Sequence, residues 1–154
     1  MEDTLHFRVA DREDIPDLLR LYAQLDGEGE PPLDASRADD IWDVLESYPD
    51  YRIHLAVSGG LVVGTFSLLV VATLSHRGTP SALVEAVVVD ANRRGGGIGR
   101  AMMRRALDIA RTKGCYKLAL SSGSRRADAH RFYDNLGFER HGVSFVAHLE
   151  EDHA

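Results

Sequence analysis

The chain has 154 residues, of which 44% are hydrophobic and 27% are charged, and its formal net charge is -6. This length and composition predict one globular domain over residues 1–154. The acidic balance argues against a nucleic-acid partner, and no apolar run approaches the roughly 18 residues of a membrane span. The polar N-terminus does not resemble a secretory signal, and a single cysteine, Cys115, excludes an intramolecular disulfide. We therefore expect a cytoplasmic protein with no membrane partner.

Apolar spacing and turn residues predict an α+β fold whose elements follow the order β-α-α-β-β-β-α-β-α-β. The predicted strands cover residues 4–9, 51–57, 61–72, 81–90, 116–121 and 143–149. The first predicted helix begins at residues 11–14 and ends near residue 25, and the second begins at residues 36–39 and ends before Pro49. The other two predicted helices cover residues 98–113 and 128–136. A tight turn at Ser58-Gly59-Gly60 pairs two strands antiparallel, and the helix over 98–113 makes its flanking strands parallel. The expected sheet is mixed and mostly antiparallel, with six to seven strands and four flanking helices.

The stretch from Leu83 to Lys113 is the most informative part of the sequence. It reads as a buried strand, a turn with four glycines in five positions (Gly95, Gly96, Gly97 and Gly99), and a helix that begins at Ile98. A backbone without side chains exposes its N–H groups, and the first turn of a helix adds unpaired donors and a positive dipole end. The junction is therefore a predicted anion site.

Two common phosphate-binding patterns do not fit this turn. A Walker loop needs Gly-Lys followed by Ser or Thr, whereas Gly99 is followed by Arg100 and Ala101. A dinucleotide fingerprint needs G-x-G-x-x-G, but Gly95 and Gly97 lead to an arginine. Arg94 to Gly99 instead spell R-x-x-G-x-G.

This signature, the strand before it, the helix after it and the segment AHRFYDNLGF at residues 129–138 together resemble the GNAT superfamily of acetyl-CoA-dependent N-acetyltransferases. Within it, residues 114–118, the FYDNLGF segment and Gly142-Val143 are similar to the glucosamine 6-phosphate N-acetyltransferase branch. The segment SSGSRRAD at 121–128 departs from that branch, because it lacks the acidic residue that the branch carries just after the strand. The sequence also resembles many bacterial GNAT proteins of unassigned substrate.

The resemblance implies a cofactor site for acetyl-CoA. The backbone of the strand would pair with the pantetheine arm, and the turn would hold the pyrophosphate, with charge added at its rim by arginine. The implied cofactor-binding residues are Val87, Val88, Val89, Arg94, Gly95, Gly96, Gly97, Ile98, Gly99, Arg100, His130 and Tyr133.

Two residues are candidates for catalysis. Glu85 is the only charge between Leu83 and Val89, so we expect it to face the place where the sheet opens for substrate, although an ordinary exposed glutamate fits the same pattern. The resemblance gives it the role of general base or of positioning the amine. By resemblance, Tyr133 falls where the family places the tyrosine that donates a proton or a hydrogen bond to the leaving thiolate. The alternative interpretation is that Tyr133 is simply an aromatic residue of the core. The histidines show no metal-ligand spacing, and we expect no metal.

The sequence therefore predicts an enzyme that transfers an acetyl group from acetyl-CoA to the primary amine of a small molecule, including an amino sugar phosphate, by direct transfer in a ternary complex. A non-catalytic acyl-CoA-binding or regulatory module, and an acetyltransferase acting on protein N-termini or lysines, are the alternatives. Because edge strands of a mixed sheet invite pairing, we also expect a homodimer.

Overall fold

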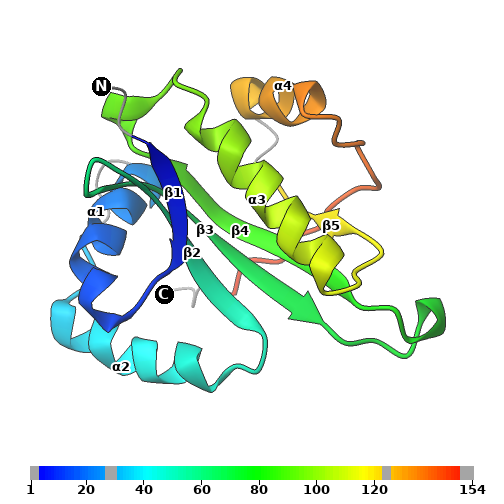
Figure 1. Ribbon diagram of the computed structural model, residues 1–154. Coiled ribbons are helices and arrows are strands. Elements are labelled where there is room, and N and C mark those ends of the chain that lie inside the picture. Colours follow the sequence, from blue (N-terminus) through cyan, green and yellow to red (C-terminus); the bar gives the residue numbers. More distant parts are fainter. Residues whose placement is uncertain (1–3, 27–30, 123–125, 150–154) are drawn as a thin grey trace. The chain divides into compact units, whose positions relative to one another are not determined.

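The computed structural model describes residues 4–26, 31–122 and 126–149 (Figure 1). The chain forms two compact units, Met1–Leu120 and Ser121–Ala154, and each is described by itself. The first unit holds β1 (Leu5–Val9), α1 (Ile15–Asp26), α2 (Ala35–Ser47), β2 (Tyr51–Ser58), β3 (Leu61–Val71), β4 (Ser81–Val89), α3 (Ile98–Thr112) and β5 (Leu118–Ala119). The second holds α4 (Ala127–Asn135). Within the described ranges, no helix is both long and apolar enough to cross a membrane.

The strands form one mixed sheet in the order β1-β2-β3-β4-β5. The first three pairings are antiparallel, and β4 pairs with β5 in parallel across the α3 connection, as the sequence predicts. Helices α1 and α2 cover one face of the sheet, and α3 packs on the opposite face, against β3 and β4 (Figure 1). We refer to these as the α1 face and the α3 face.

The prediction of six to seven strands is wrong for the part of the chain that is described, where the sheet has five. Residues 143–149, predicted as a closing strand, form no strand, and Val143, Phe145 and Leu149 are 78%, 91% and 92% exposed. An extended segment is stable as a strand only when its backbone groups pair with a neighbour, and no pairing is formed here. The strand predicted over 116–121 is reduced to two residues because its contact with β4 is equally short.

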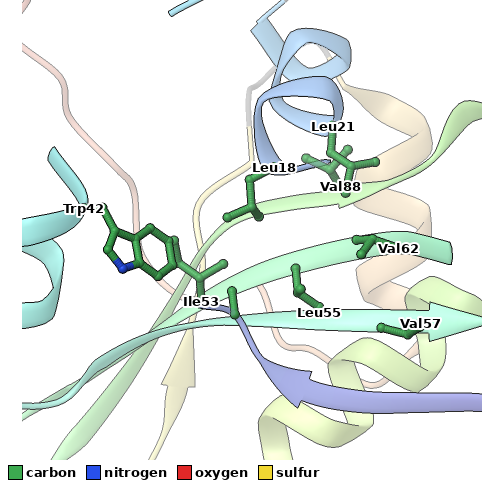
Figure 2. Close-up of a cluster of buried hydrophobic side chains, with 9 residues drawn as sticks. Leu18, Leu21, Trp42, Ile53, Leu55, Val57, Val62 and Val88 are labelled. Carbon is green, nitrogen blue, oxygen red and sulfur yellow. The ribbon is translucent and has the colours of Figure 1, made fainter. Parts of the chain in front are cut away.

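The core on the α1 face is built from apolar residues at helical spacing on α1 and at alternate positions on the strands. Figure 2 shows Leu18 and Leu21 of α1 and Trp42 of α2 directed toward the strands. Leu21 and Leu55 are completely buried. This packing fixes α1 against β3 and β4, the strands that carry the candidate site.

A glycine sets how closely α3 approaches the α3 face. A Cβ added to Gly64 of β3 would lie 2.6 Å from Met102 Sδ and 3.2 Å from the carbonyl oxygen of Val88. Met102 is fully buried and Ile98, at the start of α3, is 8% exposed. The first turns of α3 therefore rest directly on the backbone of β3, and any larger residue at position 64 would push the helix outward.

Candidate active site

The C-terminal half of β4 contains a bulge. Thr65 of β3 pairs with Val88, but Ser67 pairs with Glu85, so that Ala86 and Val87 stand opposite a single residue. Ala86 has a φ of +49°, a left-handed conformation that is strained for alanine. Bulges bend a strand and redirect its backbone groups, and they are common beside active sites.

One edge of β4 is open along the segment that contains the bulge. β4 pairs with β5 only through Ala82 and Leu83, whereas its other edge pairs with β3 as far as Val89. Within residues 4–26 and 31–120, no strand continues the pairing with β4 past Leu83. Val88 is 4% exposed and packs in the core, so the side chains of this segment build the fold while its backbone faces the open edge.

The glycine turn that follows β4 has the conformation that only glycine adopts easily. Gly95 and Gly97 have φ values of +87° and +81°, and a Cβ at either position would meet nothing within 4 Å. Gly97 is the N-cap of α3 and gives the helix no side-chain cap. The first-turn N–H groups of α3 therefore face a turn with open space around it, as an anion site requires.

Three arginines lie around this turn, and the structure separates their roles. Arg93 is partly buried and donates from Nη2 to Ser58 Oγ at 3.0 Å, so it ties the turn to the end of β2. Arg94 is exposed and its Nε lies 3.4 Å from the carbonyl oxygen of Val89. Arg100 is also exposed and lies in the first turn of α3. The two arginines predicted from the signature are thus the exposed ones.

Glu85 lies on the α1 face, because it stands directly opposite Ser67. Its side chain is exposed, whereas Ser67 is 2% exposed and its Oγ has no hydrogen-bond partner of ordinary geometry. The hydroxyl of Tyr22 on α1 lies near those of Ser67 and Thr65, and burial raises the pKa of Tyr22 while these hydroxyls lower it. A carboxylate and a tyrosine hydroxyl therefore share this face beside the bulge.

The residues that sequence reasoning missed share one property, which is that no motif marks them. Tyr22 fits the apolar spacing of α1, and this spacing predicts only that its ring is buried. Ser67 and Gly64 both interrupt an apolar strand. Such interruptions could have indicated a functional polar group or a close approach of another element to the backbone.

A model of the acetyltransferase (GNAT) family matches residues 15–138, more than three quarters of the chain. The chain belongs to the GNAT acetyltransferase family. Acetyl-CoA is the acetyl donor of this family, and the chain is an N-acetyltransferase of it.

Relatives of this GNAT protein cover it almost end to end. It is 31% identical over 138 residues to a glucosamine 6-phosphate N-acetyltransferase from Trypanosoma brucei brucei, covering 89% of this chain and 90% of the relative. The structure of a putative acetyltransferase from Agrobacterium tumefaciens superposes with a TM-score of 0.87 at 33% identity, over 93% of this chain and 99% of the other. A Trypanosoma brucei acetyltransferase structure gives 0.81 at 30% identity, over 95% and 100%. The predicted GNAT fold is thereby confirmed, with fewer strands.

The first unit of this GNAT acetyltransferase fits acetyl-CoA in two respects. The open edge of β4 offers unpaired backbone groups to an extended amide-bearing arm, and the turn from Arg94 to Arg100 offers N–H donors in a space that no side chain fills. Gly95 and Gly97 are the positions where a Cβ would intrude on that space and strain the turn.

The remaining predicted residues of this GNAT protein, His130 and Tyr133, lie on α4 in the second unit. The ring of Tyr133 contacts the rings of Phe132 and Phe138 edge-on, at centroid distances of 5.0 and 5.6 Å. Burial raises the pKa of the Tyr133 phenol, which keeps the hydroxyl protonated at neutral pH. Tyr133 is thus able to act as a proton donor, while its partly buried ring packs against these two phenylalanines.

Proposed function

We propose that this enzyme transfers the acetyl group of acetyl-CoA to the primary amine of an amino sugar phosphate, with glucosamine 6-phosphate as the first candidate. The observation that carries this proposal is the 31% identity to a glucosamine 6-phosphate N-acetyltransferase over 89% of this chain and 90% of that enzyme. The alignment spans nearly the whole of both chains and therefore extends well beyond the cofactor motif.

For the cofactor, we propose that the backbone of Val87, Val88 and Val89 pairs with the pantetheine arm at the open edge of β4. The N–H groups from Gly95 to Arg100 would bind the pyrophosphate, with positive charge from Arg94 and Arg100 at the rim. His130 would contact the cofactor from α4. The shape of the turn and the exposure of both arginines support this assignment.

For the chemistry, we propose that Glu85 accepts the proton of the acceptor's ammonium group, directly or through a water, and so presents a neutral amine. Acetyl-CoA supplies an activated thioester. Tyr133 would donate its hydroxyl proton to the cofactor sulfur as the bond between that sulfur and the acetyl carbon breaks, and its raised pKa favours the protonated form that this role needs. The exposure of Glu85 on the α1 face leaves its carboxylate accessible to an acceptor.

We also propose that both compact units act as one domain, since the family match crosses their boundary at residue 120. A cytoplasmic homodimer completes the proposal. The exposed apolar side chains of Val143, Phe145 and Leu149 are surfaces that a second copy would cover. Sedimentation of the purified protein, with dimer mass expected, tests the assembly.

The acceptor is tested by measuring thiol release from acetyl-CoA against a panel of amines: glucosamine 6-phosphate, glucosamine, an amino acid, a polyamine and a lysine-containing peptide. We expect turnover to be highest with glucosamine 6-phosphate, and a preference for the peptide would instead indicate a protein acetyltransferase. Glu85→Gln removes the proton acceptor and should lower kcat by about 100-fold with little change in CoA affinity. Unchanged turnover in this variant would remove Glu85 from the mechanism.

The pyrophosphate site is tested separately by calorimetry with CoA. Gly97→Val introduces a β-branched residue at a φ of +81° and fills the open space of the turn. We expect CoA affinity to fall by at least about tenfold, because the N–H groups of the first turn are displaced. Equal affinity of Gly97→Val and wild type would show that the pyrophosphate binds elsewhere.

A further inference from the structure

The start of the glycine turn is held by side chains of α1, far away in sequence. Arg20 Nη1 forms an ion pair of 2.7 Å with Asp90 Oδ2, and Arg20 Nη2 donates to the carbonyl oxygen of Val62 at 2.8 Å. Gln24, one helical turn later, accepts a hydrogen bond from the N–H of Ala91 at 2.9 Å. One edge of α1 is thereby fixed to Asp90 and Ala91, the two residues that follow β4 and lead into the glycine turn.

The strand next to β4 completes this anchor. Val63 is an extra residue in β3 where the register with β2 shifts, and the N–H of Asp90 donates to its carbonyl oxygen at 2.9 Å. Asp90 also accepts from the N–H of Asn92 at 3.1 Å, which shapes the short helix Ala91–Arg93. The turn is thus clamped at its start by Arg20 and at its end by the packing of α3 on Gly64.

The charge of this anchor is significant for an anionic ligand. The side chain of Asp90 is 13% exposed, and the Asn92 N–H, followed by Arg20, lowers the pKa of its carboxyl group. The carboxylate is therefore ionised and lies four residues before Arg94. With Arg20 paired to it the negative charge is neutralised, and without Arg20 it would repel a pyrophosphate bound at the turn.

We propose that Arg20 is a positioning residue for cofactor binding, which holds the turn in its binding shape and neutralises Asp90. Gln24 assists by fixing Ala91. This inference rests on the proposed pyrophosphate site, and it adds α1 to the elements that determine affinity for the donor. Neither residue is part of the R-x-x-G-x-G signature, and both act through the turn.

The test is calorimetric measurement of CoA affinity in Arg20→Gln, Asp90→Asn and the double variant. Arg20→Gln should weaken CoA binding by about tenfold, because the turn is loosened and Asp90 is left unpaired. Asn at position 90 still accepts from the Asn92 N–H but has no charge, so the double variant should recover only the affinity lost through the unpaired charge, while the loss caused by the loosened turn remains. Arg111→Gln, which breaks an exposed ion pair with Asp108 on α3, is the matched control and should bind CoA like wild type.

A second measurement separates positioning from general damage to the fold. With glucosamine 6-phosphate as the amine, Arg20→Gln should raise the KM for acetyl-CoA but leave the KM for S-acetylpantetheine, which has no pyrophosphate, unchanged. Equal losses with both donors, or wild-type CoA affinity in Arg20→Gln, would overturn the inference. If Gly97→Val binds CoA normally, the proposed pyrophosphate site is wrong. If Gly97→Val weakens CoA binding but Arg20→Gln does not, the pyrophosphate site stands and only the role of Arg20 is refuted.

Discussion

His54 of β2 predicts a specific loss of stability in mild acid. It is 8% exposed and its ring stacks on Phe66 at a centroid distance of 4.9 Å on the α3 face. Burial, with smaller contributions from the charges of Arg105, Arg52 and Lys113, lowers the pKa of His54 from 6.5 to about 4. The folded protein therefore holds this imidazole neutral at a pH where the unfolded chain has protonated it.

The sign follows from proton binding. Between about pH 6.5 and pH 4 the unfolded state binds more protons than the folded state, so the free energy of unfolding falls as the pH falls. Above pH 6.5 His54 causes almost no loss of stability. The loss of unfolding free energy is about 2 kcal/mol at about pH 5 and reaches a limit of about 3 kcal/mol below pH 4. The loss is confined to this window because the shift is a depression of the pKa of a base.

Urea denaturation measures this effect, with the fluorescence of Trp42, the single tryptophan, as the probe. Wild type should lose about 2 kcal/mol more than His54→Leu between about pH 8 and pH 5, since leucine cannot be protonated. His6→Gln, which replaces an exposed histidine of β1, is the control and should behave as wild type. Parallel loss in wild type and His54→Leu would show that the imidazole is not held neutral by the fold.

Three further predictions concern packing, catalysis and an ion pair. Gly64→Ala should lower the free energy of unfolding by about 1–3 kcal/mol in urea titrations because its Cβ collides with Met102 and Val88, whereas Gly96→Ala, with no contact closer than 3.8 Å, should not. Tyr133→Phe keeps the ring but removes the proton donor, so kcat should fall by about tenfold or more at unchanged CoA affinity, and unchanged kcat would contradict its role. Asp14→Asn should destabilise by about 1–3 kcal/mol at neutral pH, since Arg8 lowers the Asp14 pKa, and the difference should disappear in strong acid.

The sequence predicted what local patterns encode. The glycine-rich turn, the start of α3 at Ile98 and the hairpin between β2 and β3 all depend on residues that are neighbours in the chain, and the structure confirms them. The closing strand at 143–149 failed for the opposite reason. Its alternation of apolar residues is a valid strand pattern, but a strand exists only where another strand receives its hydrogen bonds.

The candidate site shows the same division. Arg94 belongs to the signature and Arg100 follows it directly, so the sequence indicated both, and the structure leaves both exposed at the turn. The bulge at Ala86 had no sequence signal, since alanine is an ordinary strand neighbour and its positive φ arises from the pairing of β3 with β4. Arg20 was equally invisible, because its partner Asp90 is 70 residues away. Contacts at such separation are set by the packing of α1 on the sheet.

The open edge of β4 also affects how this protein behaves in solution before it binds its cofactor. Unpaired strand edges are templates on which other chains add, and they are a common origin of aggregation. Here the exposed edge is short, because it runs only from residue 84 to residue 89, and the left-handed Ala86 twists it in the middle. A foreign strand would have to shift its register to pair with β4 on both sides of this interruption. The same bulge that lies in the proposed cofactor-binding segment therefore hinders the addition of a neighbouring polypeptide to that edge.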